Sequence, residues 1–524
     1  MIDCISQDLF INSEIYKYTT NNKVNSIPYQ KNTIIEININ KNNTIPEINR
    51  NDLPESIKKF RIDGTNRISR IKKGDLPEGL EILKIFGYNT ISKIDIGVLP
   101  KGLKYLKISG LNTISKFDKR VLPEGLNRLS LGQLSTISEI KKGVLPDGLK
   151  ILELFEDNII SKIERDVLPE DLKILKIGSY NTISKINKSV LPKGLKTLKI
   201  SGYNRISNID KDSLPKSLEK LKIDGKNTIS KIEKGVLPER LKTLKIDGKN
   251  TISEIEKGVL PINLVVLKIS GYNKISKLEK GVLPKSLKIL EIARYNTISK
   301  IEKGVLPEGL RDLDISGRNT ISEIEKGVLP EGLKKLYIGG HNTISNIKGF
   351  LPKGLKLLAI NGENIISKIE KEDLPDGLEK LYIGGHNTIS NIKGFLPDGL
   401  KLLDINGENI ISEIEKGVLP KGLERLEIRG HNTISEIKKG VLPEGLKYLN
   451  IDGYNTISEI KKGVLPDSLV RLHIGGNNVI SKFRKNVLPK NIKKLVLHGY
   501  NTISEDEQNS LLKDIKYLYI LNHY

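Results

Sequence analysis

The chain has 524 residues and carries 86 Lys+Arg against 63 Asp+Glu, a formal net charge of +23. Only 5% of its residues are aromatic and none is Trp, so its core must be built from aliphatic side chains. The single cysteine, Cys4, excludes an internal disulfide and every zinc site that needs several cysteines. No apolar run reaches the roughly 18 residues of a membrane span, and the N-terminus has no signal-peptide pattern. We therefore expect a cytoplasmic, intracellular protein without a membrane partner.

Leu-Pro dipeptides recur along the chain at a nearly constant interval. Of the 22 prolines, 20 follow a leucine, in a series from Leu53 to Leu488. Successive pairs lie 23 residues apart, except for two steps of 22. A typical repeat, residues 306–328, reads LPEGLRDLDISGRNTISEIEKGV. A repeat of this length cannot bury its own apolar face, so the period predicts a stack of repeats that share one core.

The repeats also set the expected domain organisation. Residues 1–29 fit no repeat and are expected to form an N-terminal tail or cap. From residue 30 to residue 524 we expect a single continuous solenoid. It consists of an atypical first unit (30–52), the 23- and 22-residue repeats (53–510) and a C-terminal capping unit (511–524).

Each repeat is expected to contain one short strand followed by turns. Leu310, Leu313 and Ile315 end in the alternation of a strand with one buried face. Proline lacks the N–H that a sheet ladder needs, so Leu-Pro belongs in the turn before the strand. Gly317 and Gly327 mark tight turns with positive φ. The prediction is a mainly-β repeat solenoid of about 20–22 rungs, one repeat to a rung, with a parallel sheet on one face and short irregular or turn segments on the other.

An asparagine follows the strand at one fixed place in 19 of 20 repeats, and an Ile and a Ser come two and three residues later in all of them. Polar groups this regular beside core residues need partners, which stacked amides and hydroxyls bonded to turn backbone would supply. We therefore expect a structural ladder rather than a catalytic row. Its members in the middle of the chain are Asn227, Asn250, Asn273, Asn296, Asn319 and Asn342.

The pattern LPxxLxxLxIxxxNxI resembles a leucine-rich repeat, and more narrowly the FNIP-repeat family of amoebae and amoeba-infecting giant viruses. The resemblance covers roughly residues 30–520, although the tetrapeptide of the family name reads Tyr-Asn-Thr-Ile at 88–91. It implies an interaction module, in some members joined to an F-box that recruits a ubiquitin ligase. A role as adaptor or substrate receptor for a ubiquitin ligase is therefore one alternative, although residues 1–50 contain no recognisable F-box.

A repeat solenoid usually binds through the concave face that its strands form. The residue between the buried Leu and Ile of each strand is basic in eight of the first ten repeats, whereas the next ten have four acids and no Lys or Arg. We expect a protein partner on this face, with charge setting its orientation and association rate. Nucleic acid along the same column is the alternative. The basic column is Arg61, Lys84, Lys107, Lys176, Lys199, Lys222, Lys245 and Lys268.

A second column precedes the ladder asparagine. It includes Tyr203, Tyr272 and Tyr295, which we expect either to pack as a stripe at the strand ends or to stack on bases. Further along the same column, His and Glu alternate from His341 to His431 and predict ion pairs. Two of these histidines would lie about 10 Å apart, too far to share a zinc ion, so we expect no metal site.

Catalytic motifs are missing from the sequence. It contains no phosphate-binding GxxxxGK[ST], no GxSxG and no HExxH. The Ser of each Asn-Thr-Ile-Ser segment has no His beside it in most repeats. We therefore expect a non-enzymatic protein without cofactors. The sequence leaves the identity of its partner open.

Overall fold

The computed structural model describes ten segments of the chain: residues 16–20, 34–39, 47–49, 53–63, 67–132, 137–155, 159–178, 180–483, 487–512 and 515–522. The chain forms two compact units. Unit 1 comprises residues 1–252 with 258–264, and unit 2 comprises residues 253–257 with 265–524. Most of the predicted tail (1–29) and of the atypical first unit (30–52) lies outside the described residues. The single continuous solenoid stays a prediction.

Short strands follow one another through both units. Those of unit 1 are β1 (Tyr16–Thr20), β2 (Ile34–Ile39), β3 (Lys59–Ile62), β4 (Ile82–Ile85), β5 (Tyr105–Ile108), β6 (Arg128–Leu131), β7 (Ile151–Leu154), β8 (Ile174–Ile177), β9 (Thr197–Ile200), β10 (Lys220–Ile223) and β11 (Thr243–Ile246). Those of unit 2 are β12 (Val266–Ile269), β13 (Ile289–Ile292), β14 (Asp312–Asp314), β15 (Lys335–Ile338), β16 (Leu357–Ile360), β17 (Lys380–Ile383), β18 (Leu402–Ile405), β19 (Arg425–Ile428), β20 (Tyr448–Ile451), β21 (Arg471–Ile474), β22 (Lys494–Gly499) and β23 (Tyr517–Asn522).

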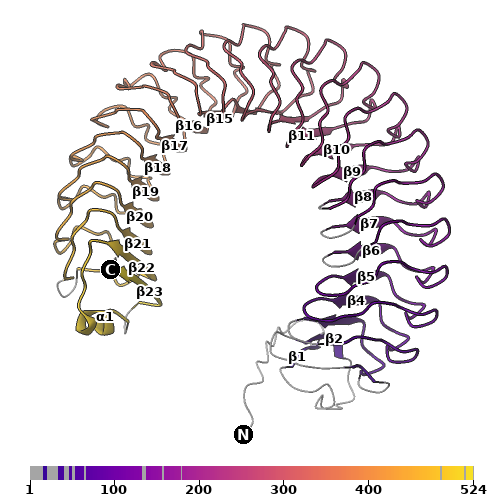
Figure 1. Ribbon diagram of the computed structural model, residues 1–524. Helices are drawn as coiled ribbons and strands as arrows, with labels where there is room; N and C mark the ends of the chain where they lie inside the picture. Colours follow the sequence, from indigo (N-terminus) through magenta and orange to yellow (C-terminus); the bar gives the residue numbers. More distant parts are fainter. Residues whose placement is uncertain are drawn as a thin grey trace. The chain divides into compact units, whose positions relative to one another are not determined.

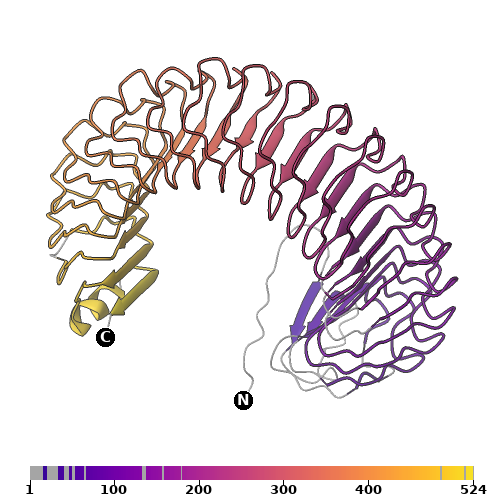
Figure 2. The ribbon, with the colours of Figure 1, turned by 45° about the horizontal axis from the view of Figure 1, so that its top comes forward.

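Neighbouring strands within each unit pair in parallel. Leu221 of β10 lies opposite Leu198 of β9 and Leu244 of β11, each at the same position of its repeat. Every position of the repeat therefore forms a column across the sheet. The strands of each unit lie side by side, and the connecting segments lie on the opposite face (Figures 1 and 2).

The core of each rung lies between the sheet and the returning loop. In β10, Leu221 and Ile223 are buried, whereas Lys220 is exposed and Lys222 is half-buried. Full burial of such an aliphatic side chain contributes about 1.5–3 kcal/mol, and the same alternation recurs from strand to strand. The predicted mainly-β repeat solenoid with a parallel sheet is confirmed.

The two 22-residue repeats absorb their missing residue in the loop. Leu336 of β15 still lies opposite Leu358 of β16, so the sheet keeps its register. Where most other repeats have a Val before Leu-Pro, the short repeats bury Phe350 and Phe395. The larger side chain occupies core volume beneath a loop that is one residue shorter.

Helix α1 (Glu505–Leu512) was not predicted, because its segment was assigned to the repeats. The backbone carbonyl of Ser504 accepts the first helical bond from the N–H of Gln508 at 2.9 Å. Acidic Glu505 and Asp506 follow it, and negative charge is favourable in a first helical turn. The polar segment EDEQNS departs from the repeat consensus, and this departure is the feature of the sequence that could have indicated the helix.

The ladder asparagines are fully buried and link each rung to the one before it. Oδ1 of Asn319 accepts a hydrogen bond from the backbone N–H of Ile298 in the preceding rung, at 2.8 Å. Its Nδ2 donates to the carbonyls of Ile292, at 2.8 Å, and Ser316, at 2.9 Å. One amide thus satisfies three backbone groups in two rungs. The Oδ1 and Nδ2 bonds recur at Asn227, Asn250, Asn296 and Asn342, and the Nδ2 bond at Asn273.

The serine three residues after the ladder asparagine does not share its burial. Ser230 and Ser322, for example, are exposed. Water can satisfy an exposed hydroxyl, so these serines do not depend on the bond to turn backbone that the sequence analysis expects for them.

The turn glycines approach one another too closely for any side chain. Gly362 has φ +71°, and a Cβ placed on it would overlap the carbonyl oxygen of Gly340 in the preceding rung. Gly349, in a short loop, has φ +74° but nothing within 4 Å of a Cβ. The first position therefore requires glycine for its conformation and for space, the second for conformation alone.

Replacing Asn319 by Ala should destabilise unit 2 by about 1–3 kcal/mol, because one N–H and two carbonyls lose their partner in the core. Urea unfolding followed by circular dichroism measures the change. The adjacent exposed Thr320→Ala is the matched control and should stay within about 0.5 kcal/mol of the parent. Equal stability of the two variants would contradict the ladder.

Gly362→Ala should destabilise the protein more than Gly349→Ala does. The second substitution incurs only the positive-φ cost of about 1–2 kcal/mol, whereas the first also forces two turns apart. Thermal unfolding of the two variants side by side checks the difference. An equal loss would mean that the turns can separate at no cost.

Candidate binding surface

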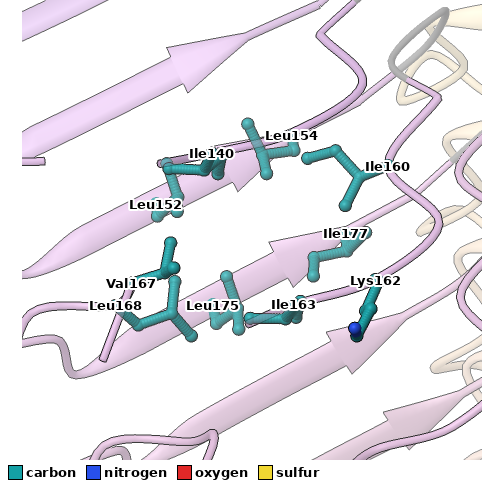
Figure 3. Close-up of a pocket in the computed structure, with 10 residues that line it drawn as sticks. All are labelled: Ile140, Leu152, Leu154, Ile160, Lys162, Ile163, Val167, Leu168, Leu175 and Ile177. Carbon is teal, nitrogen blue, oxygen red and sulfur yellow. The ribbon is translucent and has the colours of Figure 1, made fainter. Parts of the chain in front are cut away.

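Two adjacent cavities lie between the rungs of β6, β7 and β8. One has a volume of about 10 Å³ and is lined by aliphatic side chains and by Lys162. Figure 3 shows Leu152 and Leu154 of one strand lying above Leu175 and Ile177 of the next. The other cavity has a volume of about 70 Å³. Sites for small molecules usually occupy roughly 300–1,000 Å³, so neither cavity can hold a substrate, and the open strand face is the surface to consider.

Four lysines stand in register on the strand face of unit 1. Lys199 of β9 lies opposite Lys176 of β8 and Lys222 of β10, and Lys222 lies opposite Lys245 of β11. All four side chains are half-buried. Neighbouring strands lie about 4.8 Å apart, and like charges at that distance repel one another. We refer to these four residues as the lysine row.

Acids neutralise only part of the lysine row. Nζ of Lys222 lies 2.8 Å from Asp224, but Asp247 directs its Oδ1 to the N–H of Gly248 in its own turn. Among the residues that the structure describes, Lys199 and Lys245 have no carboxylate within ion-pairing distance. Within the described part of the chain, these two positive charges therefore lack a counter-charge.

Glu153 is the buried acid at one end of the lysine row. It accepts hydrogen bonds from Lys176 at 2.8 Å and from Arg128 at 2.9 Å. Burial by itself would raise the pKa of the Glu153 carboxyl, but the hydrogen bonds from Lys176 and Arg128 outweigh it and hold that pKa below its usual value. The ionised form of Glu153 therefore stabilises the fold.

The basic residues of the first rungs in unit 1 lie against aromatic rings. Two rings are each contacted by two cations, an arrangement that is favourable by cation–π attraction. The contacts are Arg61 at 4.7 Å and Lys107 at 5.0 Å from the centre of Phe86, and Lys84 at 5.4 Å and Arg128 at 4.6 Å from the centre of Tyr105. Aromatic and Arg side chains of this kind are enriched at protein interfaces.

The acidic column of unit 2 is largely neutralised within the protein. Glu291 lies 2.6 Å from Lys268, the last member of the predicted basic column. Asp404 lies 2.6 Å from Arg429, and Glu427 lies 3.4 Å from the same guanidinium. The sequence column contains four acids, and three of them have a cation beside them: Lys268 from the same column for Glu291, and Arg429 from another column for Asp404 and Glu427. Unit 2 therefore does not present a continuous strip of uncompensated negative charge.

The tyrosines before the ladder asparagine stack on one another. Tyr203 lies 5.0 Å from Tyr180 in the preceding rung, with nearly parallel rings, and Nζ of Lys226 in the following rung lies 3.5 Å from its centre. In unit 2, Tyr295 has neighbours of the same kinds. Its ring centre lies 4.5 Å from that of Tyr272 and 4.0 Å from Cζ of Arg318. The rings of Tyr203 and Tyr295 therefore use both faces within the protein and present their edges to solvent.

Two of the predicted His–Glu ion pairs are present in this column. Nδ1 of His341 lies 2.7 Å from Glu363, and Nε2 of His386 lies 3.6 Å from Glu408. All four side chains are about half exposed. Each pair offers two donor atoms only.

The structure brings together three residues that the sequence analysis did not connect. Asp452 follows β20, His473 lies in β21 and His498 lies in β22. Nε2 of His498 lies 3.4 Å from Oδ2 of Asp452, and the two imidazole centroids are 4.8 Å apart. Burial, and then the neighbouring His498, lower the pKa of His473. The feature of the sequence that could have indicated this cluster is the occurrence of two of the six histidines on consecutive strands.

Comparison with known families agrees with this architecture. The FNIP repeat model matches residues 69–110, 138–180, 180–226, 230–272, 272–318, 295–341, 319–363, 386–431 and 431–477. The chain belongs to the FNIP repeat family, which confirms the resemblance seen in the sequence.

Solved structures place the fold among leucine-rich-repeat proteins. CroV588, described as a novel circular LRR protein, is 24% identical with a TM-score of 0.61, over 93% of this chain and 82% of its own. YopM from Yersinia enterocolitica WA-314 is 25% identical with a TM-score of 0.55, over 92% of this chain and 91% of its own. No curated protein sequence matches. Repeat solenoids of this class commonly mediate protein–protein interaction.

None of the helices in the described residues has both the length and the apolar character needed to cross a lipid bilayer.

Replacing Glu153 by Gln should destabilise unit 1 at pH 7 by about 1–2 kcal/mol, a modest value because its two cationic partners are half exposed. Because the folded-state pKa is lowered, the contribution of Glu153 is complete above its unfolded pKa, about 4.3, and is lost as the pH falls through the folded pKa. The stability gap between parent and variant should therefore close in acid. Thermal unfolding at a series of pH values from 7 downward tests whether the gap narrows, with exposed Glu233→Gln as control. A gap that persists in acid would contradict the assignment.

Proposed function

We propose that the protein is a non-enzymatic interaction scaffold that binds an acidic protein surface on the strand face of unit 1. The lysine row carries this proposal. Lys199 and Lys245 are held in a stack of like charges without a counter-charge among the described residues. An acidic partner would supply the missing charges and relieve the repulsion. The face is open and extended, which suits a macromolecule better than a small molecule.

Aromatic rings beside the basic residues support a protein partner in particular. Phe86 and Tyr105 are half-buried rings held by cations at the other end of the same face. Binding hot spots are enriched in Tyr and Arg side chains, and the pair of Tyr105 and Arg128 fits that composition.

Nucleic acid is the second candidate, and the lysine row is the observation that favours it. Sequence-independent binding of single strands also needs ring faces on which bases can stack. Tyr203 and Tyr295 already use both of their faces on neighbouring side chains. This arrangement argues for the protein partner. A role as ubiquitin-ligase adaptor rests on family analogy alone.

Reversing three charges of the lysine row in one variant (Lys199→Glu, Lys222→Glu, Lys245→Glu) should weaken partner binding at least about tenfold and leave the fold intact, because these side chains lie outside the core. The experiment is affinity purification from host-cell lysate, with and without nuclease, followed by titration of the recovered partner at two salt concentrations.

The matched control reverses three exposed loop lysines of neighbouring rungs (Lys188→Glu, Lys211→Glu, Lys234→Glu), which gives the same net charge on the opposite face. This control should bind as the parent does. Equal losses in the two triple variants would reduce the effect to net charge and contradict the proposal. Recovery that disappears on nuclease treatment, with affinity falling steeply with salt, would establish nucleic acid instead.

A further inference from the structure

Two imidazoles and a carboxylate converge on the strand face of unit 2. One ligand atom each from Asp452, His473 and His498 lies within 4.8 Å of the other two. We propose that these residues form a binding site for a divalent transition-metal ion, with Zn²⁺ as the best match. The site is separate from the surface assigned to partner binding in unit 1.

The columns of the sheet explain how the three residues meet. His473 lies opposite Asn450 of β20 and Val496 of β22. Two residues further along these strands, the next column on the same face contains Asp452, then a glycine, then His498. Asp452 and His498 are thus two rungs apart, with a glycine between them.

Gly475 makes the contact across two rungs possible. A Cβ placed on Gly475 would overlap the imidazole of His498. Because the glycine has no side chain, the imidazole of His498 lies over it and extends toward Asp452. Strands two rungs apart are separated by about 9.6 Å, yet Nε2 of His498 is 3.4 Å from Oδ2 of Asp452.

That separation fits zinc coordination. Two ligands at about 2.0–2.2 Å from zinc, at the tetrahedral angle, lie about 3.4 Å from each other. His473 supplies the third donor, with a ligand atom within 4.8 Å of those of Asp452 and His498. Imidazole nitrogen with one carboxylate oxygen suits Zn²⁺, Co²⁺ or Ni²⁺ better than Mg²⁺ or Ca²⁺. Three protein ligands leave a fourth position for water.

A second observation at the same place points to a ligand. Nε2 of His473 is buried and has no hydrogen-bond partner among the described residues, and the same holds for Oδ1 of Asn450 opposite it. Buried polar atoms nearly always have a partner, whether protein, water or ion. Two polar atoms without partners among the described residues thus lie on adjacent strands. A neutral His473 with its proton on Nδ1 would present the lone pair of Nε2 to a cation.

The His–Glu pairs in the same unit provide a natural control. His341 and Glu363 lie 2.7 Å apart, but they supply only two donors and are about half exposed. Two exposed donors bind a metal far more weakly than three partly buried ones. Their replacement should therefore leave metal binding at the proposed site unchanged.

The test uses the full-length chain with Cys4→Ser and His523→Asn, so that these two donors outside the described residues cannot contribute. Zn²⁺ is titrated by isothermal calorimetry, and Co²⁺ is followed by its visible absorption, which reports a low coordination number. We expect one ion per chain. Asp452→Asn and His498→Asn should each weaken binding at least about tenfold, whereas His341→Asn combined with Glu363→Gln should not.

Asp452→Asn is the decisive variant because it preserves the fold. Its Oδ1 can still accept the hydrogen bond from the N–H of Gly453, at 2.7 Å in the parent. Circular dichroism verifies that each variant folds. If His498→Asn does not fold, Asp452→Asn and the Co²⁺ spectrum of the parent chain still test the proposal. Lack of saturable binding by the parent chain, or parental affinity in Asp452→Asn, would overturn the proposal.

Discussion

The structure depends on one constraint, the close stacking of consecutive turns. Buried asparagines such as Asn319 tie each rung to the one before it, and the glycine turns leave no room for a side chain between rungs. The strands are consequently held in one register within each unit. A residue type repeated at one position of the sequence becomes a continuous column on the surface. Both proposed sites are consequences of this rule.

Much of the fold could be predicted because its signals are local and periodic. The alternation of Leu313 and Ile315, and the glycines that follow, indicate strand and turn in most repeats. Helix α1 was not predicted, because its segment departs from the period. The lysine row was visible in the sequence since it occupies one column. Asp452 and His498 were not connected, because their contact depends on the missing side chain of Gly475.

Charge is distributed differently from what a single column suggests. In unit 1, Lys199 and Lys245 remain without a counter-charge among the described residues. In unit 2, Asp404 and Glu427 are buried against Arg429, which belongs to another column. Neutralisation thus operates between columns as well as along them. Counting charges at one position of the repeat identifies candidate binding residues. The three-dimensional arrangement of the rungs decides which of these charges are available to a partner.

The two 22-residue repeats show where the stack of rungs tolerates a change in length. Loss of one residue in a loop leaves the strand register intact, and a buried Phe takes the place of Val. The segment 335–352 is identical to 380–397, so a block of one 22- and one 23-residue repeat occurs twice in sequence. Gain or loss of such a block adds or removes two complete rungs without disturbing the columns on either side. The length of the strand face can therefore evolve by recombination between repeats, while the chemistry of each rung evolves by point mutation.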